Sequence, residues 1–256
     1  MIVRRGERLK ALAVMYHDVV ENGNYSASGF PGPGADRYKL DRLEFERHLR
    51  AIHEAIGNQP VLLTFDDGGV SAHERIAGML EQFGWRGHFF ITTGWVGKAG
   101  FLSAAQIQDL DRRGHVVGSH SKSHPVRMSR IPWDRMVSEW RESLEQLAKI
   151  VGHPVECASV PGGYYSRKVA LAAAQAGIRT LFTSEPTARV QLVDGCQVRG
   201  RYVVQQGMGP EWSAGFAAGR TLPRFRQALL WKTKRVAKLV SGGLYLRARE
   251  AIVKKA

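Results

Sequence analysis

The sequence predicts a single α/β domain, an incomplete or distorted barrel in which parallel strands alternate with helices. Three observations lead to this fold class. Short apolar runs of strand length alternate with longer segments whose apolar residues recur at helical spacing. The length of 256 residues suits one α/β barrel, which needs roughly 250 residues. No change in composition divides residues 1–219 into two parts, so we expect one barrel domain there.

The expected strands are short runs rich in valine, isoleucine, leucine and phenylalanine. The first, 11–19, ends in Tyr-His-Asp, and the others are 60–65, 87–92, 115–118, 155–160, 180–183 and 198–204. A loop rich in glycine, proline and serine follows the first strand over 21–38. Strands that alternate with helices in this way are typical of a parallel sheet, here of a (β/α)7-type barrel.

The expected helices rest on apolar spacing and on capping residues. The apolar stripe of the first helix consists of Leu43, Phe45, Leu49, Ile52 and Ile56. Ser71 is expected to cap the next helix, which reaches about residue 83. Ser103 and Gln106 have capping-box spacing, and Gly114 ends that helix. Two further helices are expected over 132–151 and 166–176.

The formal net charge of +14 is concentrated at the C-terminal end. Residues 220–256 contain eleven basic residues and one acidic residue, so they carry +10 of that charge. Apolar residues recur there at near-helical spacing, namely Leu222, Phe225, Leu229, Val236 and Val240. The pattern predicts a basic amphipathic helical tail. It either contacts an anionic membrane through 222–253 or an acidic partner, or it packs on the barrel with its basic face in solvent. Since the excess charge lies in the tail, no nucleic-acid partner is expected.

No segment has the composition of an export signal or a membrane span. The apolar run at 11–15 is too short for a secretory signal, and no stretch approaches the roughly 18 apolar residues that a membrane helix needs. Cys157 and Cys196 are far apart and are expected to be small buried residues. These features predict a cytoplasmic protein that can lie peripherally at the inner membrane surface.

Polar residues with catalytic potential follow three of the expected strands. His17 ends the first strand, Asp66 and Asp67 end the second, and His120 follows the fourth. In a parallel barrel these ends converge on one site. One aspartate with two histidines is a common set of ligands for a divalent metal. Because successive strand side chains point in opposite directions, one aspartate can hold the metal while the other acts as a base.

The second histidine of such a set is expected at the end of the segment GSHSKSHP, residues 118–125. His120 and His124 could form an i, i+4 pair on a helix, but glycine and serine are weak helix formers. Pro125 also disfavours helical backbone at His124. A loop after the strand is therefore the favoured interpretation.

The segments TFDDG, residues 64–68, and HSKSH, residues 120–124, resemble the first two motifs of the polysaccharide deacetylase family, the NodB-homology carbohydrate esterase family 4. The resemblance spans roughly 12–204. It implies a distorted β/α barrel and metal-dependent removal of N-acetyl groups from amino sugars. It also implies that Asp67, His120 and His124 bind a divalent metal, usually Zn²⁺, and that Asp66 is the general base.

The third family motif is altered in this sequence. The family's Arg-x-Pro-x-Gly segment reads Ser159-Val160-Pro161-Gly162-Gly163-Tyr164, so a serine replaces the arginine that orients the base in the family. The resemblance implies that Pro161, Gly163 and Tyr164 face the substrate, with the Tyr164 backbone N–H as a donor to the oxyanion. Arg199 and Arg201, near the last expected strand, are further candidates for substrate contact.

The general acid of the family is usually a histidine near the C-terminus, yet no histidine follows His153. The first strand, MYHDV at residues 15–19, resembles that of a permuted branch typified by poly-N-acetylglucosamine deacetylases. In that branch the acid histidine comes from the N-terminal strand, which implies His17 here.

Two functions remain open at this point. The first is a metal-dependent N-deacetylase acting on a glycan or a lipid-linked glycan precursor of the cell envelope or an exopolysaccharide. The alternative, motivated by Ser159 and by the missing C-terminal histidine, is a catalytically degraded barrel that binds carbohydrate without hydrolysing it.

Overall fold

The computed structural model describes residues 12–57 and 59–240. Its main sheet contains nine short strands: β1 (Ala13–Tyr16), β4 (Leu62–Phe65), β5 (Gly87–Ile91), β6 (Val116–Ser119), β7 (Cys157–Ser159), β8 (Thr180–Phe182), β9 (Val190–Val193), β10 (Cys196–Arg199) and β11 (Tyr202–Val203). A separate two-stranded sheet pairs β2 (Val19–Val20) with β3 (Leu40–Asp41).

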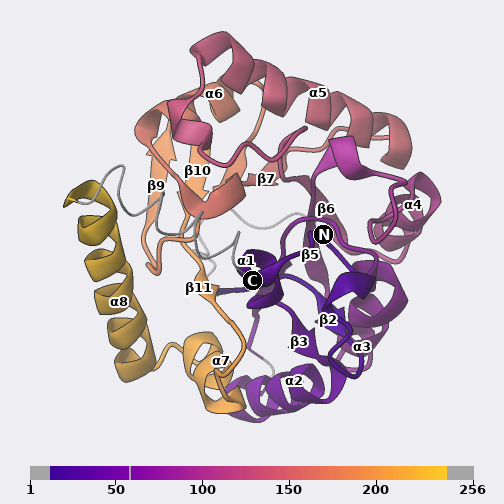
Figure 1. The fold of residues 1–256 in the computed structure, drawn as a ribbon, viewed down its shortest axis with the longest axis vertical. Helices are drawn as coiled ribbons and strands as arrows, with labels where there is room; N and C mark the ends of the chain where they lie inside the picture. Colours follow the sequence, from indigo (N-terminus) through magenta and orange to yellow (C-terminus); the bar gives the residue numbers. More distant parts are fainter. Residues whose placement is uncertain (1–11, 58, 241–256) are drawn as a thin grey trace.

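Helices surround the curled main sheet (Figure 1). They are α1 (Pro33–Asp36), α2 (Arg42–Ile56), α3 (Ala77–Glu81), α4 (Ala104–Arg112), α5 (Trp133–Val151), α6 (Arg167–Gln175), α7 (Pro210–Ala217) and α8 (Thr221–Val240). The strand order is β11-β1-β4-β5-β6-β7-β8-β10-β9, and every neighbouring pair is parallel except β10 and β9. Since β11 and β9 end the order, the barrel is open between them, and the predicted incomplete α/β barrel is confirmed.

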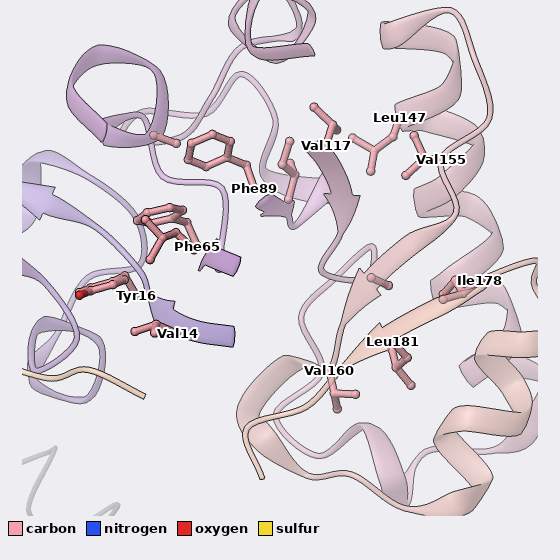
Figure 2. Close-up of a cluster of buried hydrophobic side chains, with 14 of the residues drawn as sticks. Val14, Tyr16, Phe65, Phe89, Val117, Leu147, Val155, Val160, Ile178 and Leu181 are labelled. Carbon is pink, nitrogen blue, oxygen red and sulfur yellow. The ribbon is translucent and has the colours of Figure 1, made fainter. Parts of the chain in front are cut away.

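The hydrophobic core lies between the outer face of the sheet and the helices. Tyr16, Phe65 and Phe89 come from the adjacent strands β1, β4 and β5, and their rings form a stacked row (Figure 2). The ring centroids are 5.8 Å apart for Tyr16 and Phe65 and 5.1 Å apart for Phe65 and Phe89. Phe90 belongs to a second, smaller cluster together with Phe182. Because side chains alternate along a strand, Phe90 points to the inside of the barrel, where the polar residues of the site also lie.

Two of the capping predictions have different outcomes. Ser103 and Gln106 form the expected capping box at the start of α4. Ser71 does not cap a helix, and the segment after it begins with a π-helical turn at Ala72–Ile76. The Ser71 hydroxyl donates instead to Asp18 and accepts from the backbone N–H of Val19. The prediction for Ser71 is wrong because its hydroxyl oxygen accepts from Val19 and its proton goes to Asp18, so the hydroxyl does not accept from an N–H of the helix start.

The C-terminal half differs most from the prediction. The strand expected over 198–204 is divided: β10 ends at Arg199 and pairs with β8, whereas β11 pairs with β1 at the far end of the sheet. The hairpin of β9 and β10, joined through Asp194 and Gly195, and helix α7 were not predicted. Leu43, assigned to the buried stripe of α2, is 63% exposed.

Two further features bear on the environment of the protein. Cys157 is half-buried and Cys196 is buried, both as free thiols. In the part of the chain that the structure describes, no helix combines the length and the apolar character that crossing a bilayer requires.

Candidate active site

Asp67, His120 and His124 converge at the C-terminal ends of β4 and β6. Asp67 Oδ1 lies 3.4 Å from His120 Nε2 and 3.5 Å from His124 Nε2. One carboxylate oxygen and two imidazole nitrogens therefore lie within 4.8 Å of one another. Asp67 and His120 are buried, and His124 is partly exposed. The structure thus brings together the three residues predicted from the motifs.

The electrostatics of this cluster favour a cation among the three side chains. Burial alone would lower the pKa of His120, but the charges of Asp66 and Asp67 outweigh it and raise that pKa. Burial, together with the charge of His120, lowers the pKa of His124 to about 4, so its imidazole is neutral near neutral pH and one ring nitrogen has a free lone pair. An aspartate oxygen with two imidazole nitrogens is a donor set that suits zinc. The residues therefore fit a divalent metal.

Three residues of the cluster loops have left-handed backbone conformations. Asp67, Ser121 and His124 have φ angles of 76°, 64° and 56°. Such angles are uncommon for residues other than glycine and often mark functional sites. At Asp67 the left-handed turn lets both consecutive aspartates lie near His120. The loop predicted for His120 and His124 is observed, since no helix includes either residue.

Helix α5 holds the loop that carries the two histidines. The buried Glu139 accepts a hydrogen bond from the Ser123 backbone N–H at 2.8 Å and another from the Ser123 hydroxyl at 2.6 Å. The backbone N–H of Lys122 donates to the carbonyl of Glu139 at 3.1 Å, and Ser143 of the same helix contacts Ser119 Oγ at 2.7 Å. These contacts hold the left-handed loop in place, and no pattern in the sequence indicated them.

The second aspartate, Asp66, forms a buried bidentate ion pair with Arg201. The two Nη atoms of Arg201 lie 2.7 and 2.8 Å from the two carboxylate oxygens of Asp66. Arg201 is completely buried; its Nη1 also donates to Thr64 Oγ1 and its Nε to the carbonyl of Thr183. The guanidinium lies over the inward-facing ring of Phe90, 5.6 Å from its centroid.

Arg201 supplies a positive charge beside Asp66. Burial alone would raise the pKa of Asp66, but the charges of Arg201, His120 and His17 and the hydrogen bonds from Arg201 hold it well below its usual range. Asp66 is therefore ionised near neutral pH and can accept a proton. Sequence reasoning named Arg201 only as a candidate for substrate contact, because the pairing of β11 with β1 leaves no local signal.

Ser159 lies between Asp66 and His120. Its hydroxyl donates to Asp66 Oδ1 at 3.0 Å and is 2.5 Å from His120 Nδ1. The Ser159 carbonyl is also 3.1 Å from His120 Nδ1. With these oxygen atoms as acceptors, the imidazole carries a proton on Nδ1, and its Nε2 is the nitrogen that faces Asp67. Such contacts orient the histidines that bind metals.

His17 follows β1 and lies near both aspartates. Burial would raise the pKa of Asp67, but a hydrogen bond from His120 and the electrostatic effect of His17 lower it, and His17 acts in the same direction on Asp66. Its ring packs against Tyr38, with the centroids 4.5 Å apart. Its buried Nδ1 has no hydrogen-bond partner among the described residues. The predicted acid is thus placed beside the predicted base.

The loop over 21–38 forms one wall of the site, which the sequence did not reveal. Phe30 packs at 5.0 Å from the rings of His124, Trp95 and Phe101. The buried Lys39 ammonium donates to the carbonyls of Tyr25 and Phe30 at 2.5 and 2.7 Å. The wall is therefore aromatic on the inside and fixed through its backbone.

Asp18 attaches the same loop to the barrel. Its buried carboxylate accepts from the hydroxyls of Ser28 and Ser71 at 2.5 and 2.7 Å. Gly69 passes so close that an added Cβ would collide with this carboxylate. Burial raises the pKa of Asp18 although both hydroxyls oppose the rise. Asp18 thus links the start of the loop to the Asp66-Asp67-Gly68-Gly69 turn.

The segment after β7 forms a tight turn beside the cluster. Pro161 is buried, and Gly162 and Gly163 both have left-handed φ angles, 64° and 70°. A Cβ on Gly163 would lie 2.5 Å from Ser184 Oγ, so the turn requires glycine there. Tyr164 follows, partly buried, with Arg127 over its ring at 5.4 Å from the centroid.

Comparison with protein families shows which family this chain matches. The polysaccharide deacetylase model matches residues 53–181. The chain belongs to the polysaccharide deacetylase family. Membership places it among hydrolases, and the matched region contains Asp66, Asp67, His120 and His124. His17 and Arg201 lie outside it. His17 directly follows β1, Arg201 directly precedes β11, and these two strands pair with each other.

Individual relatives are distant in sequence. The Bacillus subtilis (strain 168) protein YxkH, named as a polysaccharide deacetylase, is 21% identical over 169 residues, which are 59% of this chain and 60% of YxkH. The chain therefore matches less than two thirds of that relative.

Solved structures show the shared fold. IcaB from Ammonifex degensii gives a TM-score of 0.63 at 20% identity, covering 81% of this chain and 97% of IcaB. The Streptococcus pyogenes deacetylase PplD, solved in complex with acetate, gives a TM-score of 0.64 at 18% identity, covering 78% of this chain and 95% of PplD.

Proposed function

We propose that this protein is a metal-dependent N-deacetylase that removes acetyl groups from N-acetylated amino sugars of a glycan or of a lipid-linked glycan precursor. The observation that carries the proposal is that two adjacent aspartates have different partners. Asp67 faces two histidines, and its neighbour Asp66 is ionised by a buried arginine. Two adjacent buried aspartates with different partners suit a site in which one carboxylate binds a metal and the other accepts a proton.

Asp67, His120 and His124 are the proposed metal ligands. A divalent metal, most often zinc in such a donor set, supplies Lewis acidity to a water molecule and to the amide carbonyl when it is bound. Asp66 then accepts the proton of the attacking water, since Arg201 keeps it ionised and oriented. The Ser159 hydroxyl contacts both Asp66 and His120 and so orients these two side chains relative to each other.

Two further groups complete the proposed reaction. The Tyr164 backbone N–H, presented by the Pro161–Gly163 turn, donates to the developing oxyanion. His17, protonated, gives its proton to the departing amine, because an amine anion is a very poor leaving group. His17 approaches from β1, on the side of the site opposite to the turn after β7 in the strand order.

The proposed substrate is a sugar that carries an N-acetyl group. The aromatic residues Phe30, Trp95 and Tyr38 around the cluster offer flat apolar surfaces on which a sugar ring can stack. The relative PplD was solved with acetate, the product that removal of an acetyl group releases. A lipid-linked precursor in the cell envelope or in exopolysaccharide synthesis is the proposed class.

The test combines metal analysis with acetate release. The purified protein, loaded with zinc, is incubated with chitooligosaccharides and with N-acetylated lipid-linked sugars, and acetate is quantified. Asp66→Asn is expected to keep the metal and to lose turnover, whereas His120→Ala is expected to lose the metal. Normal turnover by the Asp66→Asn protein would refute the assignment.

The alternative, a barrel that binds carbohydrate without hydrolysis, rested on Ser159 and on the missing C-terminal histidine. The ion pair between Arg201 and Asp66, and the effect of His17 on the pKa of Asp66, support the hydrolytic proposal over this alternative. Glycan binding by a zinc-loaded protein that releases no acetate would favour this alternative.

A further inference from the structure

Helix α8 packs against the barrel through polar side chains. Arg224 Nε donates to the Tyr202 hydroxyl at 2.9 Å, and its Nη1 donates to the Gly219 carbonyl at 3.1 Å. Gln227 bonds both backbone groups of Val203: its Nε2 donates to the carbonyl at 2.7 Å, and its Oε1 accepts from the N–H at 3.0 Å. The inner face of α8 therefore satisfies the free edge of β11 as a neighbouring strand would.

The outward side of α8 exposes large apolar side chains among basic and polar ones. Leu222, Phe225, Leu229 and Leu230 are 61%, 64%, 52% and 57% exposed. Their spacing of three, four and one residues places them on one side of the helix, and we call them the outer stripe. α8 lies along the rim of the molecule (Figure 1). Single exposed leucines are common, but a row of four on one helix face marks an interaction surface.

The charges beside the outer stripe are all of one sign. Arg226 and Lys232 are exposed on the same helix, and the sequence has no acidic residue from 212 to 249. Two copies of the chain that met through this face would bring their basic residues together, which disfavours a dimer. An anionic surface that also accepts leucine and phenylalanine side chains matches both properties.

We propose that the outer stripe of α8 docks the protein on a bilayer that contains anionic lipids. Leu222, Phe225 and Leu229 would enter the boundary between headgroups and acyl chains, while Arg226 and Lys232 contact anionic headgroups. The inference goes beyond the proposed deacetylation, because it concerns a surface outside the catalytic cluster. Val236 and Val240, assigned to the same stripe from the sequence, have side chains outside the described residues, as do all residues from 241 to 253.

Vesicle sedimentation of the full chain tests this docking. The protein is expected to sediment with phosphatidylcholine vesicles that contain phosphatidylglycerol and to stay in solution with phosphatidylcholine alone. High salt should release part of the bound protein, because it screens exposed charges. No binding to the anionic vesicles, or equal binding to both compositions, would overturn the proposal.

Matched variants identify the surface. The triple variant L222S/F225S/L229S is expected to lose at least tenfold in vesicle partition. Leu43→Ser removes an equally exposed leucine from α2 and should change nothing. Arg226→Glu with Lys232→Glu should lose more than tenfold, since each basic residue near an anionic surface contributes about fivefold. Wild-type partition by the triple variant would contradict docking through α8.

Two further measurements distinguish membrane docking from dimerisation and from a failure of the proposed function. Sedimentation velocity of the free protein should show no dimer that depends on the outer stripe; such a dimer would assign the surface to a second copy. Acetate release from a soluble chitooligosaccharide should be unchanged in the triple variant. If no variant or wild-type protein releases acetate while partition still depends on the stripe, the proposed function fails and the docking surface stands.

Discussion

Replacing Arg201 by methionine tests whether this arginine keeps the proposed base ionised. Methionine fills much of the same volume inside the barrel but carries no charge and donates no hydrogen bond. The change leaves Asp66 as a buried carboxylate whose remaining hydrogen-bond donor, among residues 12–57 and 59–240, is the Ser159 hydroxyl. It also leaves the Thr183 carbonyl without the donor it has from Arg201 Nε.

The size of the effect follows from the burial of both partners. Removing one member of a buried, hydrogen-bonded ion pair costs about 3–5 kcal/mol of unfolding free energy. For a chain of this size each kcal/mol lowers the melting temperature by about 2–4 °C, so the variant should melt about 6–20 °C lower. Arg199→Met is the matched control, because Arg199 is half-buried and its side chain contacts Gln197; it should lose less than about 1 kcal/mol.

The loss should depend on pH in a direction that can be worked out. In the wild type the folded-state pKa of Asp66 is depressed, so the pair stabilises the fold above the unfolded pKa of about 3.9 and stops doing so as the pH falls through the folded pKa. In the variant, burial is no longer opposed by Arg201 and raises the pKa of Asp66. Unfolding of metal-free protein should therefore show its largest difference near neutral pH, and this difference should shrink progressively as the pH falls from ~4 toward the folded-state pKa of Asp66 in the wild type.

The same variant should also lose activity, because the raised pKa of Asp66 leaves less of the proposed base ionised. The acidic limb of the pH profile of kcat/KM should move to higher pH in Arg201→Met, and a rate loss of about 10²–10⁴-fold is expected where Asp66 is protonated. Adding Asp66→Asn should recover much of the stability, because no buried charge remains unpaired, but none of the activity. An Arg201→Met protein with wild-type stability and an unmoved acidic limb would refute the role of Arg201.

Three further changes probe other parts of the site. Glu139→Ala should weaken zinc affinity about 10–100-fold by calorimetric titration, since it frees the histidine loop; equal weakening by Glu142→Ala would contradict a specific role. His17→Ala should keep the metal content of the wild type and lower kcat about 10²–10⁴-fold, and a protein that loses metal instead would place His17 among the ligands. Gly69→Ala should lower thermal stability by about 1–3 kcal/mol, because its Cβ collides with Asp18. Gly78→Ala, where a Cβ meets nothing within 4 Å, should not; identical melting of both variants would disprove the clash.

The sequence predicted the parts of the site that depend on strand order alone. Asp67 and His120 end strands of one parallel sheet, and parallel strands present their C-terminal ends at the same edge, so their meeting required no knowledge of side-chain contacts. The loop at His124 followed from Pro125, which acts on the backbone of its own neighbour. Local chemistry of this kind is readable from adjacent residues.

What the sequence did not predict depends on contacts between distant segments. Arg201 reaches Asp66 only because β11 pairs with β1 and not with β10, and nothing within the run 198–204 indicates that the chain crosses to the other end of the sheet. Glu139 looks like an ordinary charged residue of a long helix until its carboxylate is seen to bond Ser123. Ser71 was assigned to a cap because its attraction to Asp18, 53 positions away, leaves no local trace.

The contact between Asp66 and Arg201 joins positions 135 residues apart, and this separation has a consequence for synthesis. A nascent chain that has emerged through residue 181 already holds both aspartates and both histidines, yet its Asp66 has no guanidinium partner. The proposed acid and the partner of the proposed base come from neighbouring strands that pair only when β11 docks on β1. The docking of β11 on β1 and the completion of the site are therefore the same event, and a chain that ends before Arg201 lacks the partner that orients the proposed base.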